Sequence, residues 1–137
     1  MKFDILTIFP DIFDSYFNES ILKRAQESKK ISIESHDIRK NADDKHKTVD
    51  DSPYGGGVGM VMKVEPIYKT LKQVKKSRRG KKSKVVLLSA KGRTWDQQVA
   101  HEYAQLDQII LICGRYEGVD ERVTEFIDEE ISIGDYV

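Results

Sequence analysis

Short runs of β-branched and other apolar residues recur along the chain and predict strands at residues 2–9, 31–38, 84–88, 108–113 and, more weakly, 130–133. The runs at 84–88 and 108–113 are apolar without alternating polar residues. Such runs are typical of central strands that are covered on both faces of a sheet. We therefore expect these two segments to lie in the middle of a sheet.

Helical spacing of apolar residues marks three stretches between the strands, and a shorter fourth precedes the last strand. The first begins at Asp11, and the second begins near Glu65. The third is expected to start at Thr94, because Gln97 follows three residues later and would complete a capping box. The fourth covers residues 120–127.

Strands that alternate with helices predict an α/β domain with a mostly parallel sheet and helices on both faces. The chain has 137 residues, which suits one such domain over residues 1–137 better than two. The amino-terminal segment lacks the apolar core of a secretory signal.

Composition limits the class of protein. Lys and Arg number 23 and so do Asp and Glu, so the net charge is zero and any RNA contact must come from local patches. The single cysteine, Cys113, allows no intramolecular disulfide and fits a reducing compartment. No apolar run approaches the ~20 residues of a membrane span. We expect a cytoplasmic protein without a membrane partner.

Three predicted strands end in turns that contain glycine, and ligands of open parallel sheets bind beyond the carboxyl ends of the strands. Residues 89–92 follow the third predicted strand, residues 114–118 follow the fourth, and residues 134–136 follow the fifth. Glycine allows the backbone to approach a ligand closely. We expect the three turns to form one binding crevice, although glycine often simply ends a strand.

A long polar loop at residues 39–60 breaks the strand-helix pattern. Its second half places Asp50 and Asp51 before Tyr54 and a series of glycines, which suits close approach to a planar base. The alternative is a flexible surface loop, although loops this long are uncommon unless they are functional or disordered. The glycines fit neither the dinucleotide-binding fingerprint nor the P-loop, so both kinds of nucleotide site are excluded.

Other reactive or charged residues give weaker signals. His36, His46 and His101 have no metal-ligand spacing with one another or with Cys113, so we expect no metal site. Cys113 ends an apolar strand and is interpreted as a small buried hydrophobic residue. The basic run at residues 75–84 could follow a phosphate backbone or could be a solvated helix end.

Read in order, four motifs at residues 3–10, 49–60, 113–122 and 131–137 are similar to bacterial TrmD-type tRNA (guanine-N1)-methyltransferases of the SPOUT superfamily. The resemblance runs over the whole chain. It implies a SPOUT-type α/β fold with a trefoil knot at the cofactor pocket, a rare exception to unknotted topology. It also implies a homodimer, S-adenosyl-L-methionine as cofactor, and methylation of N1 of the guanosine at position 37 of tRNA, just 3′ of the anticodon.

The resemblance further assigns roles to individual residues. Arg115 and Glu117 would lie near the target guanine. The substrate would also be enclosed by Asp50, Pro53, Tyr54, Gly55 and Gly59. The cofactor would rest on Leu87, Leu88, Ser89, Gly92, Gly114, Tyr116, Ile133, Gly134, Asp135, Tyr136 and Val137.

The chain departs from the family pattern in two places. Ala90 and Lys91 stand where the family commonly has Pro-Gln, so the family's side-chain contacts do not carry over to these two positions, whereas its backbone contacts can. The family continues past Val137 through the rest of the knot and a linker into a helical C-terminal domain, and the aspartate that accepts the N1 proton in the family lies within this continuation. We therefore expect an incomplete knot, and a chain that aligns the cofactor but is inactive alone.

Two rival functions remain open from the sequence. The first is a noncatalytic RNA-binding domain that uses the basic run at 75–84. The second is a SPOUT enzyme that methylates ribose 2′-hydroxyls, against which the 50–60 loop argues.

Overall fold

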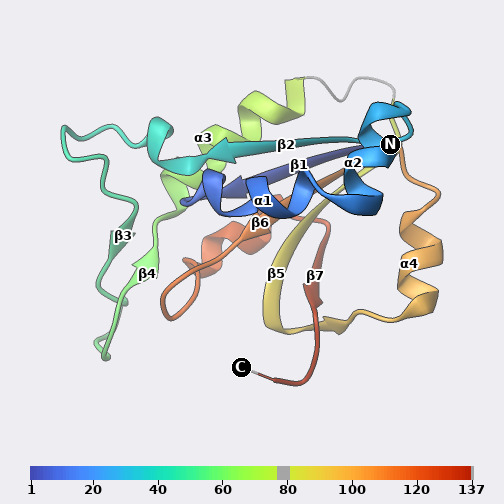
Figure 1. Cartoon of the computed structure of the whole chain (residues 1–137). Coiled ribbons are helices and arrows are strands. Elements are labelled where there is room, and N and C mark those ends of the chain that lie inside the picture. Colours follow the sequence, from blue (N-terminus) through green and yellow to red (C-terminus); the bar gives the residue numbers. More distant parts are fainter. Residues whose placement is uncertain (77–80, 137) are drawn as a thin grey trace.

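The computed structural model describes residues 1–76 and 81–136. Its centre is a five-stranded sheet in the order β2-β1-β6-β5-β7, in which all four neighbouring pairs are parallel (Figure 1). The strands are β1 (Lys2–Thr7), β2 (Ser32–Asp37), β5 (Ser83–Thr94), β6 (Gln108–Cys113) and β7 (Glu129–Ser132). The predicted parallel sheet, with β5 and β6 inside it, is confirmed.

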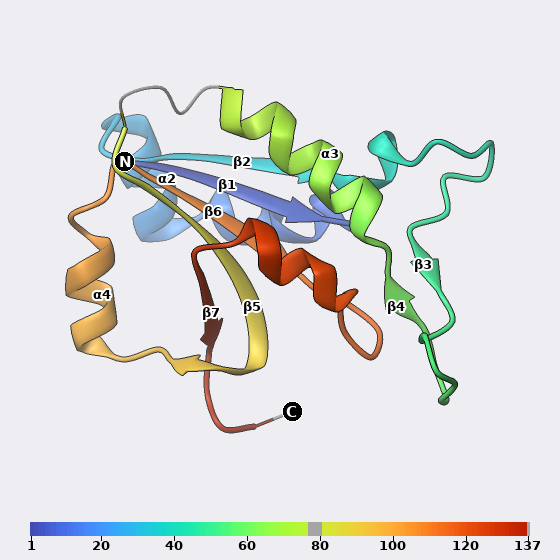
Figure 2. The same cartoon turned by 180° about the vertical axis from the view of Figure 1, so that it is seen from behind.

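Helices cover both faces of this sheet, as the sequence predicts. One face carries α3 (Val64–Lys75) and the 3-10 helix η4 (Glu121–Phe126), as Figure 2 shows. The opposite face carries 3-10 helix η1 (Pro10–Phe13), α1 (Asp14–Phe17), α2 (Ser20–Glu27) and α4 (Gln97–Tyr103). The 3-10 helix η2 (Ile38–Asn41) directly follows β2.

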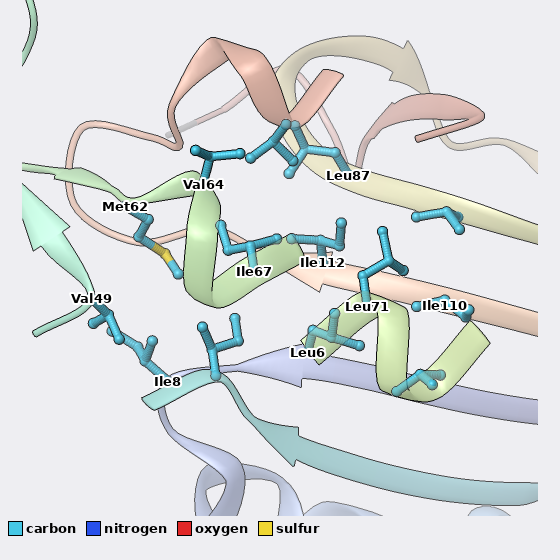
Figure 3. Close-up of a cluster of buried hydrophobic side chains, with 14 of the residues drawn as sticks. Leu6, Ile8, Val49, Met62, Val64, Ile67, Leu71, Leu87, Ile110 and Ile112 are labelled. Atoms are coloured by element: carbon cyan, nitrogen blue, oxygen red, sulfur yellow. The ribbon is translucent and has the colours of Figure 1, made fainter. Parts of the chain in front are cut away.

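The main hydrophobic core lies between the sheet and α3. Apolar residues of α3 recur at helical spacing, and Ile67 and Leu71 point at the sheet residues Leu6, Ile110 and Ile112 (Figure 3). These five side chains are at most 2% exposed. At ~25 cal/mol per Å² of apolar surface removed from water, such contacts supply the main stabilising term of the domain.

The other face of the sheet is less completely covered. Val99 and Tyr103 of α4 pack on Val86 and Ile109. Beside them, Leu88 and Leu111 are only partly buried, and they line apolar hollows of about 430 and 200 Å³ that separate α4 from α1 and α2. The strands β5 and β6 are thus packed on both faces over part of their length.

The third helix begins later than predicted, and the capping box at Thr94 is wrong. The strand β5 shifts its register between Leu88 and Arg93 and then pairs again with β7, so that Thr94 lies opposite Ser132. The residue that caps α4 is Asp96, whose carboxylate accepts a hydrogen bond from the Val99 backbone N–H at 2.8 Å. Pairing with a distant strand overrides the local capping signal at Thr94.

Two further helices differ from their predicted form. The stretch from Asp11 is not one helix but the three short elements η1, α1 and α2, and Ser20, the first residue of α2, has a positive φ of 47°. The predicted helix at 120–127 is the 3-10 helix η4, capped by the Asp120 carboxylate, which accepts from the Arg122 backbone N–H.

The long polar loop leaves the sheet and forms a separate ribbon. Strands β3 (Asp50–Asp51) and β4 (Val61–Met62) pair antiparallel, and they bracket the glycine-rich segment. The ribbon is joined to the rest of the domain where the Met62 N–H donates to the Gly118 carbonyl at 3.0 Å. Among the described helices none has the length and apolar run needed to cross a membrane.

Candidate active site

A cavity of about 570 Å³ opens beside the register shift in β5 and the carboxyl end of β6. Residues 87–91 form one wall, residues 114–119 form the second, and Glu121 and Thr124 of η4 form the third. Its volume lies within the ~300–1,000 Å³ of small-molecule sites. The position is the one at which parallel α/β sheets bind their ligands.

A larger hollow of about 690 Å³ lies at the opposite end of the strands. Its lining includes Lys2, Ser32, Lys81 and Asp107, which lie at or just before the first residues of β1, β2, β5 and β6. The amino ends of parallel strands do not present the glycine-containing turns that accept ligands. We therefore identify the smaller cavity as the candidate site.

The turn 114–118 is held in place by the polar ribbon. The Glu117 N–H donates to the Met60 carbonyl at 3.0 Å, and the Asp120 N–H donates to the Met62 carbonyl at 2.9 Å. Within this turn Tyr116 has a φ of 59°, a left-handed conformation that costs a residue with a side chain ~1–3 kcal/mol. Such strain persists where surrounding contacts fix the backbone, as they do here.

Gly59 explains how the glycine-rich loop can lie directly against this turn. Its φ is 98°, and a Cβ built on it would lie 2.5 Å from the Glu117 Cγ. A larger residue would adopt this positive φ only with strain and would also displace the Glu117 side chain. The glycine therefore has a packing reason, and it brings the 50–59 loop to the mouth of the cavity.

Tyr54 at the tip of the same loop is 82% exposed, and the guanidinium of Arg122 lies 5.8 Å from its ring centroid. Arg122 in turn forms two parallel hydrogen bonds to the Asp120 carboxylate, at 3.0 and 2.7 Å. These bonds are the main reason why the pKa of Asp120 is lowered. The loop is thus tethered to the start of η4 through charged and aromatic groups.

Lys91 and Glu121 bridge the cavity from opposite walls. The Lys91 ammonium lies 3.0 Å from a Glu121 carboxylate oxygen, and this bond raises the pKa of Lys91. Sequence reasoning did not find Glu121, Thr124 or Val119 as lining residues. The available signal was the predicted helix at 120–127, which directly follows the turn.

Residues of two predicted turns meet in this cavity, and the third predicted turn does not line it. Residues 89–92 are not a turn, because β5 continues through them to Thr94 and shifts its register there. Leu87, Leu88, Ser89, Gly114 and Tyr116 all line it together with Arg115 and Glu117. Ile133, Gly134, Asp135 and Tyr136 follow β7 outside its lining, and Val137 lies outside the described residues. The single crevice expected from the sequence is therefore met for the first two turns only.

Gly92 has a structural explanation of its own. A Cβ on Gly92 would lie 2.6 Å from backbone atoms of Glu130 and Ile131, at the register shift between β5 and β7. A glycine is needed there so that β5 can pass close to the β7 backbone.

Of the residues expected in the substrate loop, Gly59 contacts the cavity wall, whereas Asp50 lies in β3 and Pro53, Tyr54 and Gly55 lie in the turn before Gly59.

Two reactive groups outside the cavity do not form competing sites. Burial raises the pKa of the Cys113 thiol to about 11, so it is protonated near neutral pH and fits the expected hydrophobic role. Asp4, Glu34 and His36 are close enough to share a metal ion. The Lys2 ammonium already lies 3.0 Å from both carboxylates, so it supplies the positive charge.

Comparisons with known proteins agree with this geometry. The family model described as "tRNA (Guanine-1)-methyltransferase TrmD" matches residues 1–137. A tRNA (guanine-N(1)-)-methyltransferase from Geobacter metallireducens is 55% identical over all of this chain and 56% of its own length. One from Chloroflexus aggregans is 54% identical over all of this chain and 54% of its own.

A solved structure is similar over the whole chain. The crystal structure of the tRNA (m1G37) methyltransferase from Aquifex aeolicus has a TM-score of 0.88 and 40% sequence identity, covering 100% of this chain and 61% of that one. The chain spans about half the length of the curated relatives it matches. Together these matches show that the chain belongs to the tRNA (guanine-1)-methyltransferase family.

Proposed function

We propose that this chain binds S-adenosyl-L-methionine in the β5–β6 cavity and takes part in methyl transfer to N1 of guanosine 37 in tRNA. The observation that carries the proposal is the meeting of residues 87–91 and 114–119 in one cavity, beneath the glycine-rich loop. Family membership supplies the reaction class. Residues 1–137 are assigned to the cofactor-binding domain of that enzyme.

The cavity fits the cofactor in size and in the chemistry of its walls. Backbone N–H and C=O groups at the register shift in β5 and after β6 suit an adenosine, and the walls around Leu87, Leu88, Ser89, Gly114 and Tyr116 would hold it. We propose that Gly92 and residues 133–137 enclose the remaining part. The bound cofactor supplies an electrophilic methyl group on a sulfonium.

Arg115 and Glu117 are the side chains proposed to orient the guanine. Both are exposed at the cavity wall, so a base can reach them without displacing the core. A guanidinium can donate to the guanine O6, where negative charge develops as N1 attacks. The residues Asp50, Pro53, Tyr54, Gly55 and Gly59 would enclose the base from the ribbon side. Alignment of N1 with the methyl group is the main catalytic contribution of this domain.

The structure argues against the alternative of a noncatalytic RNA-binding domain. In the basic run, Lys75 donates to the Phe126 carbonyl, and Lys84 pairs with Glu129 at 2.8 Å and lies over the Tyr103 ring. These two lysines therefore have structural roles. Residues 77–80 of the run lie outside the described residues.

Further features are proposed on the family resemblance alone. They are a homodimer with active sites at the interface, a trefoil knot at the cofactor pocket, and a cytoplasmic location, where the tRNA substrate is found. Analytical ultracentrifugation tests the dimer.

Product analysis tests the function. The 137-residue chain and a version extended to the length of its relatives are each incubated with methyl-labelled cofactor and a tRNA that carries guanosine after the anticodon, and the digested nucleosides are separated. We expect 1-methylguanosine from the extended version and none from the 137-residue chain alone, and a matched tRNA with adenosine at that position should remain unlabelled. Label on a ribose 2′-oxygen would show the ribose-methylating alternative to be correct.

A further inference from the structure

Phe9, just after β1, is an exposed aromatic residue shared by two arginines. Its side chain is 45% exposed, and the guanidinium carbons of Arg39 and Arg115 lie 5.8 and 5.2 Å from its ring centroid. The three residues come from the end of β1, from η2 and from the turn after β6. All three segments follow the carboxyl ends of their strands, which point to the same side of the sheet (Figure 1).

Neither guanidinium has an acidic partner among residues 1–76 and 81–136. Arg93 and Arg122 differ in this respect, since each makes two hydrogen bonds to a carboxylate, Glu102 and Asp120 respectively. Two cations that share one aromatic ring repel each other. A bound anion removes that repulsion, and a phosphate matches the planar donors of guanidinium groups.

The location of this cluster identifies the kind of anion. Arg115 also lines the cavity that we assign to the cofactor, so the cluster of Phe9, Arg39 and Arg115 extends the cavity wall. An exposed aromatic ring between guanidinium groups is a feature of surfaces that bind single-stranded nucleic acid. An RNA strand whose target base lies at Arg115 and Glu117, at the mouth of the cavity, passes its neighbouring phosphates over this edge.

We propose that Arg39 binds a backbone phosphate of the RNA next to the target nucleotide, and that Phe9 is a positioning residue that holds Arg39 and Arg115 at the mouth of the cavity. This inference rests on the proposed function, because it takes the RNA strand to be the substrate. It adds two residues, Phe9 and Arg39, to which sequence reasoning gave no role.

The test measures binding of a fluorescein-labelled anticodon stem-loop RNA by anisotropy over a series of salt concentrations. Arg39→Gln should weaken binding about tenfold and reduce the slope of log K against log salt by ~0.7, the value for one phosphate contact of a single strand. Arg24→Gln is the matched control, because Arg24 is an exposed arginine on α2, a helix whose Gln26 lines the hollow at the amino ends of the strands. It should change neither quantity.

Phe9 is tested by rescue. Phe9→Leu should weaken RNA binding several-fold, whereas Phe9→Tyr, which keeps an aromatic face, should bind as the unchanged protein does. Equal effects of Leu and Tyr would overturn the positioning role. Circular dichroism verifies that each variant is folded.

Cofactor calorimetry on the same variants separates this inference from the function on which it rests. We expect Arg39→Gln to keep its affinity for S-adenosyl-L-methionine. If the cofactor binds but Arg39→Gln and Arg24→Gln have the same RNA affinity and slope, the Arg39 contact is wrong and the proposed function stands. If the unchanged protein binds neither cofactor nor RNA, both fail.

Discussion

The charged side chains at the two ends of the parallel strands differ in whether they have partners of opposite charge. At the amino ends, the buried Asp4 carboxylate receives hydrogen bonds from His36 at 2.8 Å and Gln108 at 2.6 Å, and Lys2 lies 3.0 Å away. At the carboxyl ends, Arg39 and Arg115 share an aromatic ring without a carboxylate partner in the described part of the chain. Paired charges stabilise the fold, whereas unpaired ones remain available to a ligand.

The largest expected effect lies at the carboxyl ends. Gly114 lines the cavity, and a Cβ there would contact only the Val119 side chain, at 3.4 Å, so the fold tolerates a small side chain. The two branches of valine would instead occupy the space of the ligand. Gly114→Val should abolish binding of S-adenosyl-L-methionine in calorimetry while the far-UV spectrum remains that of a folded protein.

Gly114→Ala is the control for this experiment, since it adds one methyl group without a clash with the fold. It should bind the cofactor more weakly than the unchanged protein but measurably. Undiminished affinity in Gly114→Val would show that the cofactor does not occupy the β5–β6 cavity.

The opposite pattern is expected at the amino ends. Asp4→Ala removes the shared partner of His36, Gln108 and Lys2, and it leaves the buried Gln108 Nε2 without its acceptor. Breaking a buried charged network costs ~3–5 kcal/mol, so the free energy of unfolding in urea should fall by about 3 kcal/mol. Cofactor affinity of the folded protein should not change, and a parallel loss of affinity would contradict the separation between the two ends.

The same carboxylate predicts a pH dependence of stability. Burial alone would raise the pKa of Asp4, but hydrogen bonds from His36, Gln108 and Lys2 lower it below its usual value. A lowered folded-state pKa gives stability that is present above the unfolded-state pKa of ~4 and is lost as the pH falls through the folded-state value. Urea unfolding between about pH 6 and pH 3 should show this loss, and Asp4→Asn should make the profile flatter.

Sequence patterns predicted the features that depend on local residues or on a general rule of parallel sheets. The apolar runs at 85–88 in β5 and 109–113 in β6 identify two central strands, and the spacing in α3 identifies its buried face. The meeting of residues 87–91 with the turn after β6 follows from the parallel pairing of β5 and β6, which sets Leu88 opposite Cys113.

Features that depend on contacts between segments far apart in the sequence were not predicted. The second half of β5 exists because β7 pairs with it again after the register shift, and neither segment reveals this pairing alone. Thr94 and Asp96 are both suitable N-cap residues for α4. Because Thr94 is paired with β7, Asp96 is the residue that caps the helix. The cluster of Phe9, Arg39 and Arg115 joins three separate segments, so no motif within one segment contains it.

The smallest expected effect returns to the amino ends, where Lys81 lines the larger hollow and Lys82 precedes β5. Changing both to Ala should weaken tRNA binding only modestly, because the two ammonium groups lie at the opposite end of the strands from the cavity. Contacts to phosphate position an RNA without reading its bases, so the methylated base should remain the same. Filter binding at two salt concentrations measures the first effect, and nucleoside analysis of the methylated tRNA measures the second. A change in the methylated base would show that the amino-end lysines help to select the target, and the division of the molecule into a stabilising end and a binding end would then be wrong.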